Sequence, residues 1–387
     1  MAVVLAIVAG PANCGSNASS GAPTILFAGG VTKKRTLASA ELYQPNQGAS
    51  GSFVATGAMK TARVGHTATE LENGQVLIAG GASKMFDGPK IFASAERYNP
   101  SKGRFSNTGA MLEARSGHTA TLLANGKVLI ACGEDGTTSL TDSELYDPAS
   151  ATFAETGPMS IGRDECTATM LANGKVLIAG GYQLLPDFSG SVLDTAEIYD
   201  PASGLFSLTG TMTSPRQGPT ATLLPDGKVL ITGGIDNNQN VLDTAEMYDP
   251  VTGEFSAAGH MTTTRYGHLA AVLGDGDVLI AGGMDNAGSS LKSAELFDAK
   301  SGSFGAIAAM PRDRFMVGAT VLTSSTILIA GGYTQCPSSA ASFCEKPVST
   351  ALIFDHKSDT FRSISSMTSP RGTFASASLG YHGGGHQ

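Results

Sequence analysis

Residues 115–133 read RSGHTATLLANGKVLIACG, and this stretch decides the fold. Two short apolar segments flank the turn residues ANGK, and Asn-Gly between two such segments is typical of a β-hairpin. The second segment and the small residues after it recur along the chain about fifty residues apart. The seven copies are TILFAGG (24–30), QVLIAGG (75–81), KVLIACG (127–133), KVLIAGG (175–181), KVLITGG (228–234), DVLIAGG (277–283) and TILIAGG (326–332). This period predicts a fold built from copies of one structural unit.

The segments between these copies carry the same features in the same order. After a variable loop comes a motif such as AELYQP or SELYDP, then one phenylalanine, a methionine and an arginine. The phenylalanines are Phe53, Phe105, Phe153, Phe206, Phe255, Phe304 and Phe361, and the methionines are Met59, Met111, Met159, Met212, Met261, Met310 and Met367. The arginines are Arg63, Arg115, Arg163, Arg216, Arg265, Arg314 and Arg371. Each unit therefore predicts four short strands that bury their apolar side chains against neighbouring units.

A double glycine, a tyrosine about fifteen residues later and then a further aromatic residue resemble the Kelch repeat. The resemblance covers about residues 24–380 and all seven copies. Kelch units usually have tryptophan where this chain has phenylalanine, which keeps an aromatic side chain at that position. The resemblance implies a β-propeller in which each repeat forms one radial sheet.

The two ends of the repeat region complement one another. The first unit begins at TILFAGG and lacks an innermost strand, whereas RGTFASASLGY supplies an innermost strand with no successor. We therefore expect an all-β, seven-bladed propeller of four-stranded blades, closed by the N-terminal strands plus the C-terminal strand over residues 24–382. Residues 1–23 are interpreted as an apolar segment and flexible connector, either a trimmed export signal or an extra strand, and 383–387 as a tail.

Composition excludes some classes of function. A formal net charge of -8 argues against a nucleic-acid partner, whose binding surface would normally be basic. The N-terminal apolar run is too short for a transmembrane span. No cofactor is predicted from the sequence.

Four of the five cysteines are disulfide candidates. Cys336 and Cys344 are close enough in sequence to staple one loop, which favours an oxidising compartment and hence an extracellular, periplasmic or cell-surface location. Cys132 replaces the first glycine of its pair, and Cys166 replaces a histidine of the next repeat. We hypothesise a disulfide between these two blades; two buried free thiols are the alternative. Cys14 is left without an assigned partner.

Six of the repeat arginines accompany a glutamate at another fixed repeat position. The arginines are Arg63, Arg115, Arg163, Arg216, Arg265 and Arg371, and the glutamates are Glu41, Glu96, Glu144, Glu197, Glu246 and Glu295. One interpretation is a positive ring near the axis that captures an anion. The other, which we favour, is a structural pair that orders the turn, because the unit with Leu352 in place of glutamate also departs from the strand pattern. The histidines of the RxGH motif, His66, His118 and His268, are likewise interpreted as structural, since the repeat would spread them around a ring.

The loops after the glycine pairs vary most, and in repeat scaffolds such loops carry specificity. The candidate ligand-binding residues are Arg35, Lys84, Phe86, Tyr182, Leu185, Phe188 and Tyr333. Apolar and aromatic groups in exposed loops mark binding surfaces, although packing between loops is an ordinary alternative. Asp236, Asn238 and Asn240 alternate as in a calcium loop, but the rest of that motif is absent.

Three interpretations of function follow. The first is a secreted or cell-surface module that binds a protein or glycan through the loop face without chemistry. The second is a self-assembling surface or matrix subunit that uses the N-terminal strand. The third is a carbohydrate-active enzyme, since some Kelch-like propellers resemble copper-radical sugar oxidases or sugar mutarotases. No residue of this chain could be matched to such a site, so no catalytic residue is predicted and the sequence favours a binding module.

Overall fold

The computed structural model describes residues 22–45, 50–86, 88–335 and 345–380. Residues 1–21, Cys336, Cys344 and the last residues of the chain therefore lie outside the described residues. The described residues form β-strands and no helices, so they contain no helix that could span a membrane. Repeated runs of β-branched and aromatic residues, broken by glycine-containing turns, explain this all-β structure.

Seven four-stranded antiparallel sheets contain one copy of the repeat each. From innermost to outermost strand, blade 1 consists of β32 (Ala375–Leu379), β1 (Thr24–Ala28), β2 (Ala40–Gln44) and β3 (Ser52–Thr56). Blade 2 has β4 (Thr67–Glu70), β5 (Val76–Ala79), β6 (Ala95–Asn99) and β7 (Arg104–Asn107), and blade 3 has β8 (Thr119–Leu122), β9 (Val128–Ala131), β10 (Ser143–Asp147) and β11 (Thr152–Thr156). Blade 4 has β12 (Thr167–Met170), β13 (Val176–Ala179), β16 (Ala196–Asp200) and β17 (Leu205–Leu208).

The remaining blades repeat this order. Blade 5 has β18 (Thr220–Leu223), β19 (Val229–Thr232), β20 (Thr244–Asp249) and β21 (Glu254–His260), and blade 6 has β22 (Leu269–Val272), β23 (Val278–Ala281), β24 (Ala294–Asp298) and β25 (Ser303–Ala306). Blade 7 has β26 (Gly318–Thr323), β27 (Thr326–Ala330), β30 (Ala351–Asp355) and β31 (Thr360–Ile364). Two loop hairpins, β14 (Tyr182–Leu184) with β15 (Gly190–Val192) and β28 (Tyr333–Gln335) with β29 (Glu345–Pro347), extend blades 4 and 7.

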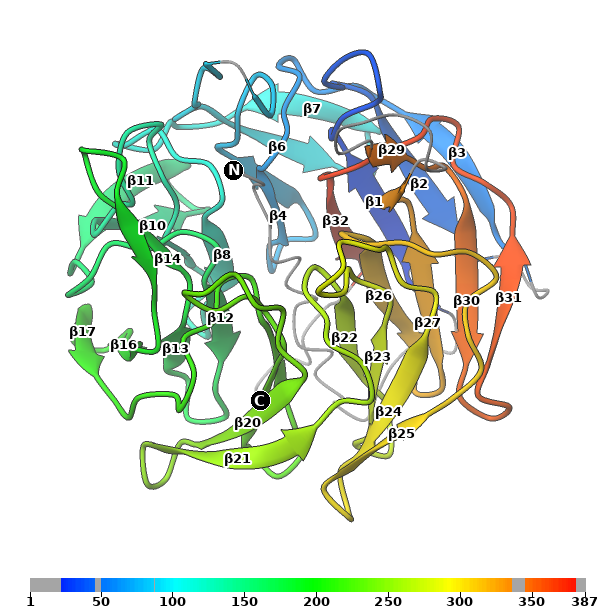
Figure 1. The fold of residues 1–387 in the computed structure, drawn as a ribbon. Helices are drawn as coiled ribbons and strands as arrows, with labels where there is room; N and C mark the ends of the chain where they lie inside the picture. Colours follow the sequence, from blue (N-terminus) through cyan, green and yellow to red (C-terminus); the bar gives the residue numbers. More distant parts are fainter. Residues whose placement is uncertain (1–21, 46–49, 87, 336–344, 381–387) are drawn as a thin grey trace, which may run out of the picture.

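The blades are arranged around a central axis, as Figure 1 shows. Each innermost strand contacts the innermost strands of both neighbouring blades, and the contact between β32 and β4 completes the ring. β32 pairs with β1 over five residues, with Ala377 opposite Leu26. The structure thus confirms the predicted seven-bladed propeller and its closure by the two ends of the repeat region.

The core lies between adjacent blades. Every residue of the VLIA strands is buried, because this second strand of each blade has a sheet on both sides. The repeat tyrosine packs against the repeat phenylalanine, with ring centroids 4.8 Å apart for Tyr98 and Phe105. The Tyr98 hydroxyl lies 2.8 Å from Thr56 Oγ1 of the preceding blade, which satisfies its buried polar end. One repeat position thus supplies both apolar packing and a polar link between blades.

The three repeat histidines are buried, and burial lowers their pKa values to about 3. His118 Nε2 lies 3.1 Å from Thr67 Oγ1 of the preceding blade, and His268 Nε2 lies 3.0 Å from Thr220 Oγ1. In blade 1 the position of Thr67 and Thr220 is occupied by Ala375, which has no hydroxyl group. Neither ring nitrogen of His66 forms a well-aligned hydrogen bond to a described residue. His118 and His268 therefore link the innermost strands of adjacent blades, and the described residues do not bring the three histidines to one site.

We predict that Ala375→Thr stabilises the propeller, because its hydroxyl would offer His66 the hydrogen bond that Thr67 and Thr220 give His118 and His268. The free energy of unfolding should rise by about 0.5–1.5 kcal/mol, the net contribution of one hydrogen bond. Equilibrium denaturation in urea measures this change. Ala375→Val has nearly the same shape without a hydroxyl, so an equal gain in that variant would contradict the proposed hydrogen bond.

Candidate functional site

Two kinds of segment meet on one face of the propeller, which we call the loop face. They are the loops after the glycine pairs and the crossovers that carry the repeat methionine and arginine. The residue after each arginine pairs with the residue after each glycine pair, close to where the innermost strands begin. These bridges are Val31 with Gly372, Val64 with Ala82, Ser116 with Glu134, Asp164 with Tyr182, Gln217 with Ile235, Tyr266 with Met284, and Phe315 with Tyr333. Because the pairs surround the axis, residues far apart in sequence form one continuous surface.

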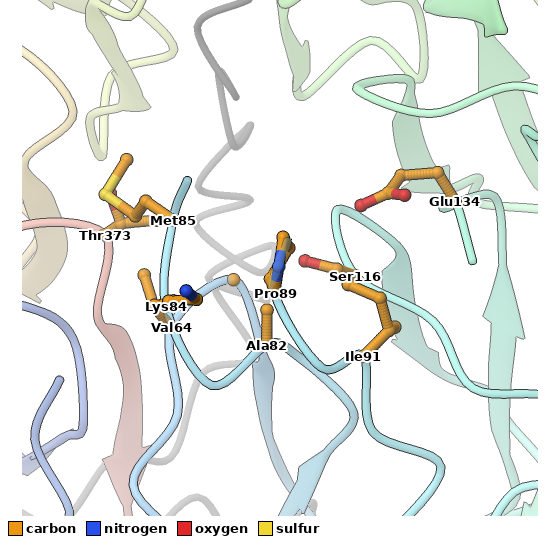
Figure 2. Close-up of a pocket in the computed structure, with 10 residues that line it drawn as sticks. Val64, Ala82, Lys84, Met85, Pro89, Ile91, Ser116, Glu134 and Thr373 are labelled. Carbon is orange, nitrogen blue, oxygen red and sulfur yellow. The ribbon is translucent and has the colours of Figure 1, made fainter. Parts of the chain in front are cut away.

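A shallow, open pocket lies on this face beside blade 2. Its apolar walls come mainly from the loop after the blade 2 glycine pair, whereas the crossovers and blade 3 supply polar groups. The lining residues are Val64, Gly65, Ala82, Lys84, Met85, Pro89, Ile91, Ser116, Glu134 and Thr373. In Figure 2 the Glu134 carboxylate points toward the pocket from blade 3. The pocket therefore joins an apolar wall to a carboxylate.

The loop with Met85 reaches from blade 2 across blade 1 to blade 7. Tyr333 donates its hydroxyl proton to Met85 Sδ at 3.2 Å, and this hydroxyl lies 2.9 Å from Thr373 Oγ1. Phe315 stacks on the Tyr333 ring with centroids 5.4 Å apart. Tyr333 is only 2% exposed, so the expectation of an exposed loop residue is wrong for this position. Its side chain supports the loop face from below.

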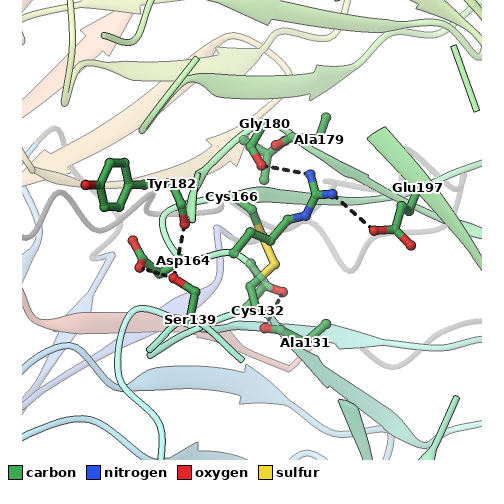
Figure 3. Close-up of a disulfide and its surroundings, with 12 residues drawn as sticks. Ala131, Cys132, Ser139, Asp164, Cys166, Ala179, Gly180, Tyr182 and Glu197 are labelled. Atoms are coloured by element: carbon green, nitrogen blue, oxygen red, sulfur yellow. Dashed lines mark hydrogen bonds and ion pairs between the residues drawn. A yellow bond between two sulfur atoms is a disulfide. The ribbon is translucent and has the colours of Figure 1, made fainter. Parts of the chain in front are cut away.

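Asp164 forms a buried acidic group on the blade 4 side of the loop face. Its Oδ2 accepts a hydrogen bond of 2.8 Å from Ser139 Oγ, as Figure 3 shows. Burial raises the pKa of Asp164 to about 7, the Ser139 bond opposes this shift, and the charge of Glu134 adds to it. Burial also raises the pKa of Glu134. Burial therefore makes the charged forms of both carboxyl groups less favourable.

A disulfide between Cys132 and Cys166 lies beneath this group and joins blade 3 to blade 4 (Figure 3). The Cα atoms are 6.7 Å apart, inside the range that a disulfide needs. In blade 2 the equivalent glycine, Gly80, lies so close to His118 that an added Cβ would be 2.7 Å from the ring. The first glycine of the pair contacts the next blade's histidine wherever that histidine is present, for Gly29, Gly80 and Gly233, so cysteines at the two positions can form a disulfide.

The remaining loop candidates occupy separate parts of the same face. Lys84 is exposed and lines the pocket, while Phe86, from the same loop, is 51% exposed. Tyr182 is half-buried at the base of the β14–β15 hairpin, and its tip exposes Leu185 by 39% and Phe188 by 70%. Arg35 is exposed in the blade 1 loop. The structure brings only Lys84 of these candidates into the pocket.

Asp236, Asn238 and Asn240, which alternate as in a calcium-binding loop, form a turn that is closed by its own hydrogen bonds. Asp236 Oδ1 accepts the backbone N–H groups of Asn238 and Asn240, both at 2.8 Å, and Oδ2 accepts a bond from the Asn240 amide. Burial is the largest single effect and raises the pKa of Asp236, but the hydrogen bonds from Asn240 and Asn238 together outweigh it, so the pKa is lowered. The carboxylate therefore orders its own turn, as expected for an Asx motif.

Sequence reasoning missed Met85, Ser116, Glu134, Asp164 and Thr373. All except Met85 stand one or two positions after a repeat arginine or directly after a glycine pair. These positions differ among the seven copies, whereas the repeat arginine is present in all seven and the double glycine in six. That contrast is the signal which could have identified them.

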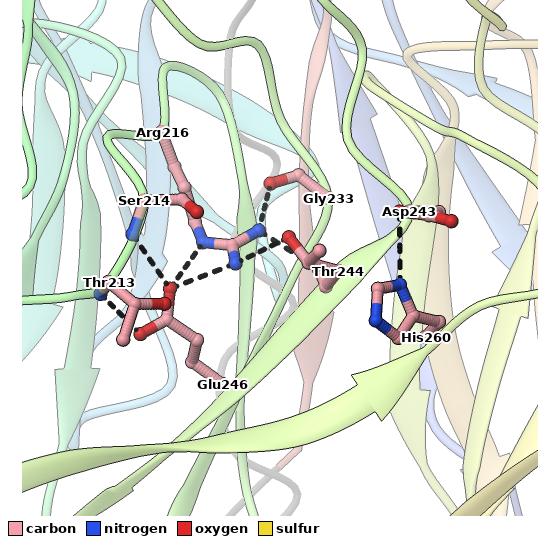
Figure 4. A network of polar contacts seen from close by, with 8 residues as sticks. All are labelled: Thr213, Ser214, Arg216, Gly233, Asp243, Thr244, Glu246 and His260. Carbon is pink, nitrogen blue, oxygen red and sulfur yellow. Dashed lines mark hydrogen bonds and ion pairs between the residues drawn. The ribbon is translucent and has the colours of Figure 1, made fainter.

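A buried ion pair holds each crossover in blades 1 to 6. The distances between arginine nitrogen and glutamate oxygen range from 2.8 to 3.5 Å, for Arg371–Glu41, Arg63–Glu96, Arg115–Glu144, Arg163–Glu197, Arg216–Glu246 and Arg265–Glu295. In Figure 4 the Arg216 guanidinium also donates to the carbonyls of Gly233 and Thr244, both at 2.9 Å. Glu246 in turn accepts the backbone N–H of Thr213 at 2.7 Å. Since the arginines are at most 1% exposed, they do not form a ring that solvent anions could reach.

Blade 7 departs from this arrangement. Leu352 takes the place of glutamate, and Pro311 takes the place of the residue that donates a backbone N–H to it. Arg314 remains 1% exposed and donates to the Thr350 carbonyl at 3.2 Å, but its Nε has no partner among the described residues. Burial lowers the pKa of Arg314 to about 10, although the charge of Asp313 opposes this. Blade 7 therefore buries a cation without the usual carboxylate.

We predict that Arg216→Met and Arg314→Met differ sharply in stability. The first leaves Glu246 buried without its cation and should lower the free energy of unfolding by about 3–5 kcal/mol. The second leaves no buried carboxylate behind and should cost clearly less. Denaturation in guanidinium chloride compares the two variants directly. Equal losses would show that the ion pair is not what holds the crossover.

We also predict that Asp164→Asn changes how stability depends on pH. Folding raises the pKa of Asp164 from 3.8 to about 7, so its contribution to stability is complete below pH 3.8 and lost as pH rises through 7. Asparagine does not titrate, so from pH 5 to 8 this variant should gain about 2–4 kcal/mol relative to the parent chain. Unfolding curves at both pH values test this. Asp187→Asn, at an exposed position, is the control and should show no such gain.

Comparison with known proteins agrees with this architecture. A family model described as the KLHDC2/KLHL20/DRC7 Kelch-repeats domain matches residues 65–283, more than half of the chain. The matched residues extend from the start of blade 2 into blade 6. A search of curated proteins gave no match. Kelch propellers generally bind protein partners, and this chain, with seven repeats of which six carry a double glycine, belongs to the Kelch-repeat family.

Proposed function

We propose that this chain is a non-catalytic binding module that takes a protein partner on the loop face, centred on the pocket beside blade 2. The observation that carries the proposal is where variation lies in the repeat. Buried positions such as the VLIA strands are nearly identical in all blades, while the pocket is built from positions that differ. A scaffold that keeps its interior and varies one face is organised for recognition.

The pocket chemistry favours a basic, partly apolar segment of the partner. Met85, Ile91 and Val64 supply an apolar wall, and the Glu134 carboxylate lies at its blade 3 end. A lysine or arginine side chain fits this combination, because its apolar stem can contact the wall while its charged end binds the carboxylate. Lys84 is exposed at the rim and can turn its ammonium group into solvent.

The disulfide supports an oxidising location for this module. A buried Cys132–Cys166 pair fits an extracellular, periplasmic or cell-surface setting better than a reducing cytosol. We propose such a location. Glycan binding and self-association draw no support from a contact among the described residues, and the segment invoked for self-association lies mostly outside them.

We predict that peptides selected from a random display library against the whole chain carry lysine or arginine next to an apolar residue. Their affinity, measured by fluorescence anisotropy, should fall about tenfold in Glu134→Gln, because a hydrogen bond to a charged group contributes about 1.5–3 kcal/mol. Met85→Asp should weaken binding at least as much by making the wall polar.

Val251→Asp is the matched control for this experiment. Val251 is 92% exposed in the β20–β21 turn, on the face opposite the loops, so this variant should bind normally. If the selected peptides bind Glu134→Gln and Met85→Asp as tightly as the parent chain, the proposed site is wrong. Recovery of acidic peptides would contradict its chemistry.

A further inference from the structure

A histidine and three aspartates meet on the face opposite the loop face, between blades 6 and 7. Asp275 and Asp277 belong to the β22–β23 turn, while His356 and Asp359 belong to the β30–β31 turn. One ligand atom each of Asp275, Asp277 and His356 lies within 4.8 Å of the other two. His356 Nε2 is 2.8 Å from Asp275 Oδ2, and His356 Nδ1 is 2.8 Å from Asp359 Oδ1.

Three of these four residues are exceptions to the repeat. Position 277 is Thr24, Gln75 or Thr326 in three other blades and lysine in the remaining three, where it pairs with an aspartate of the same blade: Lys127–Asp147, Lys175–Asp200 and Lys228–Asp249. His356 stands where the other copies have Pro45, Pro100, Pro148, Pro201, Pro250 and Ala299. Asp359 adopts φ +48° where five copies have Gly51, Gly103, Gly204, Gly253 and Gly302. Three independent exceptions therefore converge on one seam of the propeller.

The arrangement matches the chemistry of a metal-binding histidine. A ligating imidazole usually donates its second ring N–H to a carboxylate, which fixes the ring, and Asp359 stands in that position here. The other ring nitrogen faces two carboxylates, so the set offers one nitrogen and two oxygen ligands with further positions open to solvent.

We propose that Asp275, Asp277 and His356 bind a divalent transition-metal ion, with Zn²⁺ as the ion that suits them and Asp359 as the residue that orients His356. Ligands of tetrahedral zinc at about 2.0–2.2 Å are roughly 3.4 Å apart, so the Asp275–His356 pair must open slightly and Asp277 must approach. Gly274 and Gly276 flank Asp275 and allow that adjustment. This inference does not depend on the proposed partner binding.

The ion would fasten blade 6 to blade 7. On the loop face of the same seam, the crossover into blade 7 lacks the carboxylate that docks the other crossovers, because Leu352 replaces glutamate. The two blades already touch on this face, since Gly274 of the β22–β23 turn donates its backbone N–H to the carbonyl of Ser324, in the β26–β27 turn of blade 7, at 2.7 Å. A bound ion would thus reinforce a blade boundary whose crossover lacks the buried ion pair found in blades 1 to 6.

The test is a zinc titration of chelator-treated full-length chain by isothermal calorimetry, with thermal unfolding followed with and without Zn²⁺. The terminal histidines are removed from all samples by the changes His382→Ala and His386→Ala, because they could bind zinc themselves. Asp277→Lys is the principal variant, since it restores the residue that other blades use and should fold normally. We expect the parent to bind one more zinc than this variant and to gain a higher melting temperature that the variant does not show.

Asp359→Asn gives an independent readout, because asparagine tolerates φ > 0 and loss of the orienting carboxylate should weaken zinc binding about 10–100-fold. Equal zinc stoichiometry and affinity in the parent and Asp277→Lys would overturn the proposal and leave His356 as an ion pair with two aspartates. Calcium binding that His356→Asn does not alter would overturn it as well, because an imidazole ligand would then play no part.

Discussion

The buried arginine of each crossover is the interaction on which the rest of the structure depends. In blade 5 the Arg216 guanidinium contacts the first glycine of the pair, the start of the third strand and Glu246, which in turn holds the crossover backbone. One side chain therefore fixes the three segments that leave the sheet at the loop face. A charge in this interior is tolerated only when its hydrogen bonds are satisfied, so its partners cannot vary freely. The loops beyond these anchors can vary more freely, because the arginine and its hydrogen-bond partners lie outside them.

Most of the fold could be predicted from the sequence because each blade repeats the same packing problem. The strand order, the closure of blade 1 by β32 and the distinction between the two faces follow from the order of the motifs. The contact between the first glycine and the next blade's histidine also recurs, so the paired exchange for Cys132 and Cys166 could be noticed before their distance was known.

The loop face could be predicted only in outline. Tyr333 is buried because Met85, nearly 250 residues earlier in the chain, reaches over it, and no repeat pattern encodes the path of a single loop. Glu134 and Asp164 gain their properties from burial beside one another, which depends on how the loops of blades 3 and 4 fold back. Sequence shows which positions vary, whereas the contacts among the variable positions arise only in three dimensions.

Residues that depart from the repeat are also informative, because a departure at one position is accompanied by a departure at a position that contacts it. A change at one blade boundary must be compensated across it: the disulfide replaces both members of a glycine–histidine contact, and Pro311 lacks the N–H that the missing glutamate would have accepted. By this reasoning Asp277, His356 and Asp359 also form one set, since random drift would not place three departures within reach of one another. In a sevenfold structure the six other copies act as internal references, and a coordinated departure from them indicates a local function that the fold itself does not require.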